Sequence, residues 1–279
     1  MTRIAPRLAA VIGGLVLPAA IIALWWGFTA HSRNPFWPPL SKIVARFRED
    51  WLFKLVPTEL VPSLVRLAEG FSIGVVLALV IGVALGLLPT FRVALAPIMD
   101  FARSVPNAAL IPAAFFLFGI GDWSKSSMVA WATFWPVVLN TIDGVRGIDQ
   151  NLHDVASVYK LRRRDKLLLV VFPAAAPQII AGLRVGLTLA LLALVVTEIF
   201  IATSGIGYFI GVSQTRYDIV SMWTGIFVLM ILAYCLNALF NVLEARALEW
   251  HRAPRTAGRG AEMRETMPTV TTAGQGSNV

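Results

Sequence analysis

Long runs of apolar residues, separated by shorter polar connections, dominate the chain. A helix needs about 20 mostly apolar residues to cross a bilayer, and six segments meet this requirement: Leu8–Phe28, Phe71–Leu88, Val93–Phe118, Ser126–Ile142, Ile179–Ile201 and Ile219–Leu243. The runs are continuous and do not alternate between apolar and polar positions, which is typical of lipid-embedded helices and not of barrel strands. The pattern therefore predicts an all-α integral membrane protein with six transmembrane helices.

The first apolar run follows a short basic segment, residues 1–7, as a secretory signal would. However, its uncharged stretch is longer than the roughly 7–15 residues of a signal core, and no clear small-residue cleavage site follows it. We expect a retained helix. The predicted organisation is a cytoplasmic N-terminus (1–7), a transmembrane domain (8–250) and a disordered cytoplasmic tail (251–279), because the last segment is rich in Gly, Thr, Arg and Ser.

Composition agrees with a membrane protein. Hydrophobic residues make up 57% of the chain and charged residues only 14%, against about 25% charged in soluble domains. The net charge of +8 does not indicate a nucleic-acid partner here, because the basic residues cluster between the apolar runs. With both termini in the cytoplasm, roughly twice as many Lys and Arg residues lie in the cytoplasmic connections as in the outer ones, which supports that orientation. The single cysteine, Cys235, excludes an internal disulfide or a cysteine-based metal site.

The connection between the fourth and fifth apolar runs, residues 144–177, is too long to be a simple loop. Asp149 is a suitable N-cap, and an apolar stripe follows at helical spacing, made by Leu152, Val155, Ala156 and Tyr159. A second short helix is expected from Lys166 to Phe172, with Pro173 ending it. The first helix is either an amphipathic helix lying on the lipid interface or a helix that docks into a groove of a partner protein, and periodicity does not separate the two.

This connection resembles a motif of binding-protein-dependent ABC importer permeases, written E-A-A, three residues, G, nine residues, I-x-L-P. Without gaps, the motif falls on Asp154, Val155, Ala156, Lys160, Val170, Phe172 and Pro173. Further segments, including RSVPNAALIPAAFFLFGIGDWSK, FWPVVLNTIDGVR, PAAAPQIIAGLRVGL and TEIFIATSGIGY, resemble the nitrate, sulfonate and taurine group of these permeases. The resemblance covers about 62–249, and it is specific to the group and not to one substrate.

The resemblance implies a type I importer fold in the bacterial inner membrane, with the 149–173 segment coupling the chain to a cytoplasmic ATP-binding subunit. It also implies a second permease copy, most simply a homodimer, and an extracytoplasmic solute-binding protein. The residues expected at the ATPase contact are Asp154, Ala156, Tyr159, Lys160, Leu161, Arg162 and Pro173. Two positions depart from the motif: Asp154 replaces Glu, and Lys160 replaces a Gly that normally supplies a positive φ.

Polar residues within the apolar runs are candidates for the translocation path, namely Arg103, Asn107, Asn140 and Glu198. Asp100 and Arg103 are three apart on one helix face, so they form a structural pair or Arg103 guides an anionic solute. Glu198 either holds the segment 204–211 or lines a gate. It lies about four turns from Arg184, too far for direct pairing. Pro97, Pro106 and Pro112 are expected to kink the third run.

No catalytic or cofactor set is evident. The chain lacks a G-x-x-x-x-G-K-[ST] phosphate loop, and its three histidines lie outside the apolar runs, so neither an ATPase nor an intramembrane enzyme is favoured. A stand-alone channel or secondary transporter remains the main alternative, although the internal repeats typical of many such proteins are not seen. Five tryptophans fall at the expected outer interface, as an aromatic belt or as a docking surface for a binding protein: Trp25, Trp26, Trp37, Trp51 and Trp123. The leading hypothesis is one half of an ATP-driven importer for a small anionic solute.

Overall fold

The computed structural model describes residues 16, 20–30, 32, 34–52 and 54–249. The expectations for 1–7 and 251–279, and most of the first apolar run, lie outside this part of the chain. The chain divides into two units, 1–236 and 237–279, and the boundary falls inside the last helix. All regular elements of the described residues are helical, as the continuous apolar runs predict.

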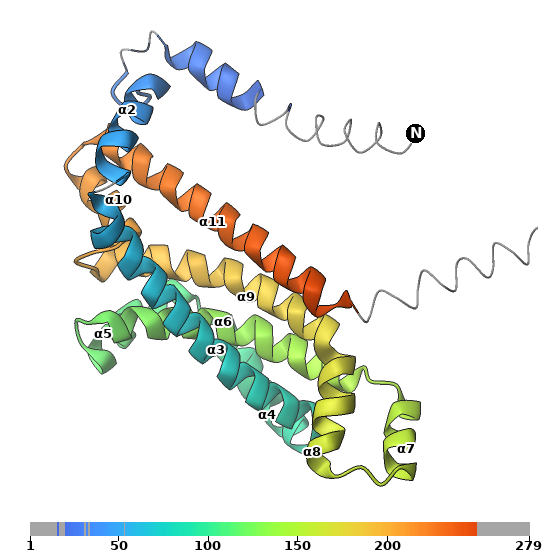
Figure 1. Ribbon diagram of the computed structural model, residues 1–279. Coiled ribbons are helices and arrows are strands. Elements are labelled where there is room, and N and C mark those ends of the chain that lie inside the picture. Colours follow the sequence, from blue (N-terminus) through green and yellow to red (C-terminus); the bar gives the residue numbers. More distant parts are fainter. Residues whose placement is uncertain (1–15, 17–19, 31, 33, 53, 250–279) are drawn as a thin grey trace, which may run out of the picture. The chain divides into compact units, whose positions relative to one another are not determined.

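An apolar helix, Ala20–Thr29, precedes the other helical elements (Figure 1). They are α2 (Leu40–Trp51), η1 (Val56–Leu60), α3 (Val61–Leu87), α4 (Pro89–Ser104), η2 (Asn107–Leu110), α5 (Ile111–Phe118), α6 (Asp122–Arg146), α7 (Gln150–Val158), α8 (Arg163–Lys166), η3 (Leu167–Val171), α9 (Phe172–Ile201), α10 (Ile206–Thr215) and α11 (Ile219–Ala247).

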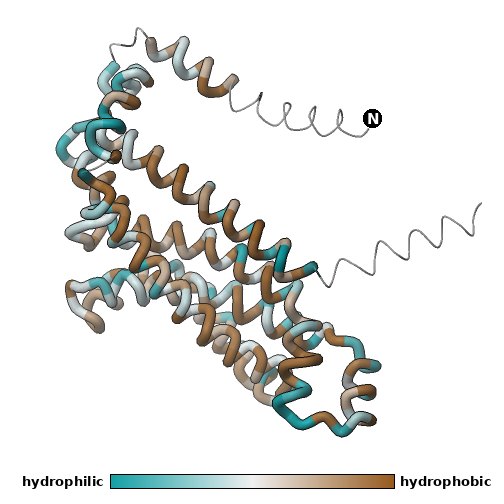
Figure 2. Tube along the Cα trace, viewed as in Figure 1, coloured by the Kyte–Doolittle hydropathy of each residue, from teal (hydrophilic) through white to brown (hydrophobic). Residues whose placement is uncertain are grey.

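Three helices of the described part are long and apolar enough to cross a membrane: Val56–Leu87, Arg163–Ile201 and Ile219–Ala247. Figure 2 shows the apolar residues along these helices and hydrophilic ones in the connections. A fourth span results if the bent pair of α4 and η2–α5 is counted together. The fourth predicted run forms α6, which has 25 residues but does not meet the same test of apolarity.

The third predicted run is not one kinked helix, and that prediction is wrong. It breaks after Ser104, and the two halves, Pro89–Ser104 and Asn107–Phe118, lie at 88° to each other. Val105 is extended, with ψ 121°, as expected for a residue that precedes a proline. Pro97, in contrast, lies inside α4. Pro106 therefore separates two helices instead of bending one.

A second correction concerns Pro173. No helix ends there, because α8, η3 and α9 form one continuous helix from Arg163 to Ile201. Pro173 occupies the first turn of α9. The five-residue π-helical turn that precedes it, Leu167–Val171, changes the backbone hydrogen-bond pattern just before the proline ring. The segment between α6 and α9 thus contains one separate helix, α7, at the end of the bundle (Figure 1).

Small residues allow α3 to pack closely against α6. Gly70, Gly74, Ala78, Gly82 and Gly86 recur every four residues on one face of α3. A Cβ atom at Gly82 would lie 2.7 Å from the Cβ of Thr141, and one at Gly86 would lie 2.6 Å from the Cβ of Val145. This is the small-residue packing common between membrane helices, where van der Waals contact replaces the hydrophobic effect.

Candidate functional site

The helix α7 carries apolar side chains that the chain itself leaves uncovered. Asp149 caps the helix as predicted, accepting a hydrogen bond from the backbone N–H of Asn151. Val155, Val158 and Tyr159 are all more than half exposed, and Tyr159 reaches 76%. The predicted stripe is therefore divided: Ala156 faces the protein and is buried, whereas its neighbours are accessible. The exposed surface of α7 is suited to a partner.

Charged residues surround this exposed surface. Asp154 is exposed and accepts a hydrogen bond from Gln150 Nε2 at 3.1 Å. Arg162 is extended at the start of α8 and exposed. A polar pocket of about 540 Å³ brings the end of α3 and the start of α4 together with α7, and it is lined in part by Arg92, Arg146, Asp154 and Lys166. The ends of α3 and α6 and the start of α8 therefore lie on the same side of the bundle.

A second cavity, which we call the mid-helix cavity, lies between the α4–α5 break and the middle parts of α6 and α9. Its volume is about 460 Å³. The residues that give it its chemistry are Arg103, Asn107, Ile111, Trp131, Trp135 and Thr197. Two of the four path candidates, Arg103 and Asn107, therefore meet in one place because the chain bends at Pro106.

The pairing predicted for Arg103 is present. Its Nε and Nη2 atoms lie 3.0 and 2.9 Å from Asp100 Oδ1, and both side chains are half exposed or more. Asn140 does not line the cavity. It donates from Nδ2 to the backbone carbonyl of Pro136 and accepts from Gln178 Nε2 at 2.9 Å, so it joins α6 to α9.

Glu198 belongs to a buried charge network at the opposite end of α6 from α7. It is fully buried, and its Oε1 lies 2.8 Å from Nη1 of Arg66, which is only 3% exposed. Ser63 Oγ donates to the same carboxylate. Arg66 also contacts Asp122, at 2.7 Å, and the backbone carbonyl of Ser204. One guanidinium thus joins α3, α6, α9 and the segment before α10.

The same network caps the N-terminus of α10. The backbone N–H of Gly205 donates to Glu59 Oε2, that of Ile206 to Ser63 Oγ and that of Gly207 to Glu198 Oε2, at 2.7–3.0 Å. These are N–H groups that a helix cannot satisfy internally, and carboxylates suit the positive end of its dipole. Of the two roles considered for Glu198, the contacts are those of a residue that holds the 204–211 segment.

Asp122 lies four residues before the apolar run of α6, and its side chain is two-thirds exposed. Partial burial acts to raise the pKa of Asp122. The hydrogen bonds and positive charges of Arg66 and Lys125 outweigh this effect, so the pKa of Asp122 is lowered. Its carboxylate is therefore ionised at neutral pH, where it offsets the buried Lys125 ammonium 3.2 Å away.

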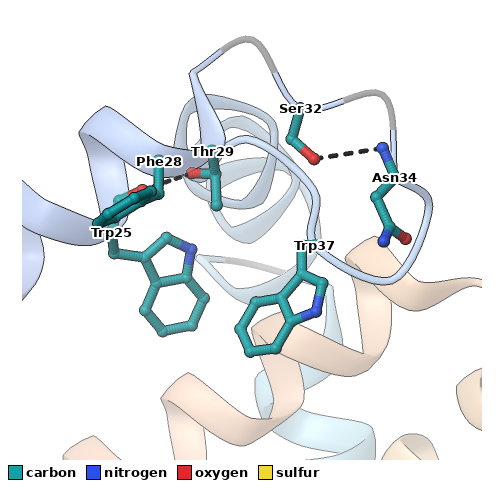
Figure 3. A pocket seen from close by; sticks show the side chains of 6 residues that line it. All are labelled: Trp25, Phe28, Thr29, Ser32, Asn34 and Trp37. Carbon is teal, nitrogen blue, oxygen red and sulfur yellow. Dashed lines mark hydrogen bonds between the residues drawn. The ribbon is translucent and has the colours of Figure 1, made fainter.

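A third pocket, of about 480 Å³, lies beside the helix Ala20–Thr29. Figure 3 shows Trp25 and Trp37 side by side at this pocket, with Ser32 and Asn34 on the segment above them. The described residues that line this pocket are all uncharged. The prediction that Trp51 belongs to an interfacial aromatic belt is wrong. Its side chain is buried, and the indole N–H donates a hydrogen bond to Thr224 Oγ1 at 3.0 Å.

The comparisons with known proteins match the part of the chain that contains these sites. The family described as "Binding-protein-dependent transport system inner membrane component" matches residues 72–249. The chain is 33% identical over 243 residues to a Bacillus subtilis protein named as the aliphatic sulfonates transport permease SsuC, covering 86% of this chain and 88% of that protein. The chain belongs to this permease family. It is 30% identical over 240 residues to the Escherichia coli taurine transport system permease TauC, covering 84% and 87%, and 35% identical over 148 residues to the Synechocystis nitrate import permease NrtB, covering 53% and 54%.

Membership makes the chain a multi-pass inner-membrane permease of the ABC transporter class and a transport component, not an enzyme. The resemblance read from the coupling motif is therefore confirmed. In the permease, the motif runs from Asp154 in α7, through α8 and the π-helical turn, to Pro173 in the first turn of α9. Leu161, at the connection after α7, donates its backbone N–H to the carbonyl of Ala156, which closes the end of the helix.

Lys160 occupies the left-handed conformation that the usual glycine of the motif would favour, with φ 51°. The turn geometry is thus kept although the residue is changed. A left-handed residue other than glycine costs about 1–2 kcal/mol, which the surrounding turn must offset.

We expect Lys160→Gly to retain transport and to keep or slightly raise the melting temperature of the permease, because glycine removes this strain. The change is checked by solute uptake and by thermal unfolding in detergent. Lys160→Ala is the matched control, because it removes the charge but keeps the strained backbone. Markedly reduced uptake in both variants would show that the ammonium group itself takes part in transport.

The sequence did not point to Arg66, the central residue of the charge network. Arg66 precedes the second predicted run, Phe71–Leu88, but the helix that contains this run begins at Val56, which places Arg66 within it. The available signal was the pair of charged groups Arg66 and Glu198 in two apolar segments, since ionisable groups at membrane depth usually have a partner. Because 132 positions separate Arg66 from Glu198 in the sequence, local patterns did not predict that the two side chains are in contact.

Proposed function

We propose that this permease forms half of the translocation path of an ATP-driven importer for a small anionic solute. It pairs with a second copy of itself, receives solute from an extracytoplasmic binding protein and is moved by a separate cytoplasmic ATPase through α7. The observation that carries the proposal is the exposed apolar surface of α7, with Val155, Val158 and Tyr159 uncovered at the end of the bundle.

The surroundings of α7 favour docking over burial in lipid. Asp154 and Gln150 lie on α7 itself, and three consecutive arginines follow it at 162–164. An apolar surface set among charges, on one short helix, is the form used by helices that insert into a partner's groove. Amphipathic helices that bind anionic lipid instead place basic residues along their own polar face, and α7 contains no Lys or Arg.

The arrangement of helix ends supports the expected orientation with six membrane helices. The α3–α4 turn and the α6–α8 connection share one end, where Arg92, Arg146 and Lys166 line a common pocket. The starts of α3 and α6 and the end of α9 share the other, through Arg66, Asp122 and Glu198. Basic residues mark cytoplasmic connections, so the α7 end is assigned to the cytoplasm.

The anionic nature of the solute is inferred from two sources. Relatives are named for transport of aliphatic sulfonates, taurine, nitrate and bicarbonate, which share an oxygen-rich anionic group. In this permease, Arg103 lines the mid-helix cavity and is the one charged residue among the described residues that line it. A guanidinium is well suited to oxyanions.

The coupling role is tested by co-purification of the ATP-binding subunit with the detergent-solubilised permease. Tyr159→Asp is expected to reduce the captured ATPase at least tenfold, because truncating a central aromatic contact costs about 2 kcal/mol or more. Tyr217→Asp is the matched control, since Tyr217 is equally exposed, at 79%, but lies between α10 and α11. Equal capture by both variants would contradict the proposal.

The sidedness of α7 is tested separately with Val158→Cys in a Cys235→Ser background. A membrane-impermeant thiol reagent should label this cysteine only after the cells are opened. Labelling in sealed cells would place α7 outside, where no ATPase is available, and would exclude this function.

A further inference from the structure

Three positively charged side chains of the described residues converge on the pocket beside α7, which we call the basic pocket. Arg92 comes from α4, Arg146 from the end of α6 and Lys166 from α8. Asp154 is the single carboxylate among the described residues that line it, so three cations against one carboxylate leave an excess of two positive charges. The orientation of a membrane protein requires only that basic residues lie on one side of the bilayer, and it does not explain why these three meet in one pocket.

Two of the cations have no partner in the part of the chain that the structure describes. The side chains of Arg92 and Lys166 make no hydrogen bond or ion pair there, although both are partly buried. Arg146 lies 3.6 Å from Asp143, but both side chains are more than half exposed, and such pairs contribute little. The helix start at Pro89, which also lines the pocket, has no side-chain cap, and its backbone N–H groups favour an anion as well. The basic pocket is therefore suited to an anion from outside the chain.

The basic pocket lies at the level of the lipid headgroups. Leu87, the last residue of the apolar helix Val56–Leu87, lines it, and so does Lys166, in the first turn of the apolar helix Arg163–Ile201. Both helices are longer than the roughly 20 residues needed to cross the hydrocarbon core, so their ends reach the headgroup region. Basic pockets between membrane helices at this level suit the headgroups of anionic phospholipids.

Exposed apolar side chains adjoin the basic pocket and distinguish a lipid from a free anion. At the α3–α4 turn, Leu88 and Phe91 are 49% and 61% exposed. Just after Lys166, Leu168 and Leu169 are 63% and 68% exposed. A phospholipid with its phosphate in the pocket places its chains against these surfaces, whereas a soluble phosphate makes no use of them. The volume of about 540 Å³ is sufficient for a phosphate ester with its glycerol.

The basic pocket uses a different face of α7 from the one proposed to bind the ATPase. Gln150, Asp154 and Ser157 line the pocket and recur at i, i+4 and i+7, which places them on one face of the helix. Val158 and Tyr159, of the proposed docking surface, lie on the adjoining face. Because all three cations come from other helices, an anion in the pocket leaves Val158 and Tyr159 accessible to the ATPase.

We propose that the basic pocket binds the headgroup of an anionic phospholipid of the inner membrane. The phosphate accepts charge-assisted hydrogen bonds from Arg92 and Lys166, and the chains lie against the exposed apolar residues beside the pocket. A lipid with two phosphates, such as cardiolipin, best matches the excess of two positive charges. The inference goes beyond the proposed function and is independent of the ATPase contact.

Binding is measured by native mass spectrometry of the detergent-purified, full-length permease, titrated with cardiolipin, phosphatidylglycerol or phosphatidylcholine. We expect cardiolipin to bind about fivefold more tightly than phosphatidylglycerol, which has one negative charge fewer, and the zwitterionic phosphatidylcholine to bind most weakly. Glycerol 3-phosphate supplies a phosphate ester without chains. It should bind at least about tenfold more weakly than cardiolipin, because the apolar contacts are lost.

Variants assign the contacts. Arg92→Gln and Lys166→Gln should each weaken cardiolipin binding about fivefold, and the double variant about 25-fold. Neither change should alter the melting temperature without lipid, because neither side chain has a partner in the described part of the chain. Arg216→Gln is the matched control, since Arg216 is exposed after α10 and outside the pocket, and it should leave cardiolipin binding unchanged. Asp154→Asn should strengthen cardiolipin binding severalfold, an opposite effect that a purely structural role of the cations would not produce.

Three outcomes would overturn the inference: equal binding of cardiolipin and phosphatidylcholine, unchanged cardiolipin binding in the double variant, or glycerol 3-phosphate binding as tightly as cardiolipin. The second result, together with lost capture of the ATPase by the double variant, would assign the pocket to an acidic segment of the ATPase. The third would assign it to a free phosphate ester. The proposed function is tested separately, because Tyr159→Asp should lose ATPase capture and keep cardiolipin binding. Retained capture by Tyr159→Asp contradicts the proposed function and leaves the lipid site in place.

Discussion

Arg66→Met is expected to lower the melting temperature of the solubilised permease by about 10 °C and to abolish uptake. The substitution leaves the Glu198 carboxylate fully buried without its cation. Removing one partner of a buried ion pair costs about 3–5 kcal/mol, and each kcal/mol shifts the melting temperature by roughly 2–4 °C in a chain approaching this size. The measurement is thermal unfolding in detergent, followed by size-exclusion chromatography.

Arg46→Met is the matched control for this prediction. Arg46 also forms an ion pair, with Asp50 at 2.8 Å, but its side chain is 45% exposed, and exposed pairs contribute at most about 1 kcal/mol. The double variant Arg66→Met, Glu198→Gln should recover part of the lost stability, because the amide is neutral and its carbonyl still accepts from the N–H of Gly207. A melting temperature of Arg66→Met close to that of Arg46→Met would show that the network does not hold α3, α6 and α9 together.

Gly74→Leu is expected to destabilise the permease by about 3 kcal/mol or more, the upper range for overpacking, and to lower the yield of monodisperse protein. A Cβ atom at Gly74 would lie 2.6 Å from the backbone carbonyl of Ala130 and 2.9 Å from the Cβ of Thr133. Because a backbone atom is involved, no side-chain rotation relieves the clash, and α3 and α6 must separate along the whole small-residue face.

Gly27→Leu is the control for Gly74→Leu. Gly27 lies in the apolar helix Ala20–Thr29, and no heavy atom surrounds the position of its missing Cβ within 4 Å. The same substitution there adds an apolar side chain to open space and favours the helix, so we expect normal yield. If both glycine variants unfold alike, apolar bulk in general is harmful, and close packing of α3 on α6 is not the cause.

Several features followed from local sequence. The apolar runs predicted helices because a backbone in lipid must satisfy its own hydrogen bonds, and five of the six runs fall on long helices or on the bent pair α4–α5. Asp149 was predicted as a cap, and it caps α7. The motif from Asp154 to Pro173 predicted the family to which the comparisons assign the chain.

Other features were beyond local reasoning. The amphipathic helix α2, Leu40–Trp51, lies between the first two predicted runs, where the sequence predicted no element, because a single short helix is not distinguished from a loop by span length. Trp51 was assigned to the interface from its position, whereas its environment depends on the side chain of Thr224, which is 173 positions away. Arg103 and Asn107 were both path candidates, but their meeting at one cavity required the turn at Pro106.

The sequence by itself determined that this protein is a helical membrane permease and where the motif of its family lies, because apolar length and motif spacing are properties of neighbouring residues. Only the tertiary structure decided that Arg66 neutralises Glu198, that glycines bring α3 against α6 and that a cavity forms beside Arg103. These depend on which helix faces approach one another, and that choice is made by packing and by the cost of burying an unpaired charge, which periodicity along a single helix does not record.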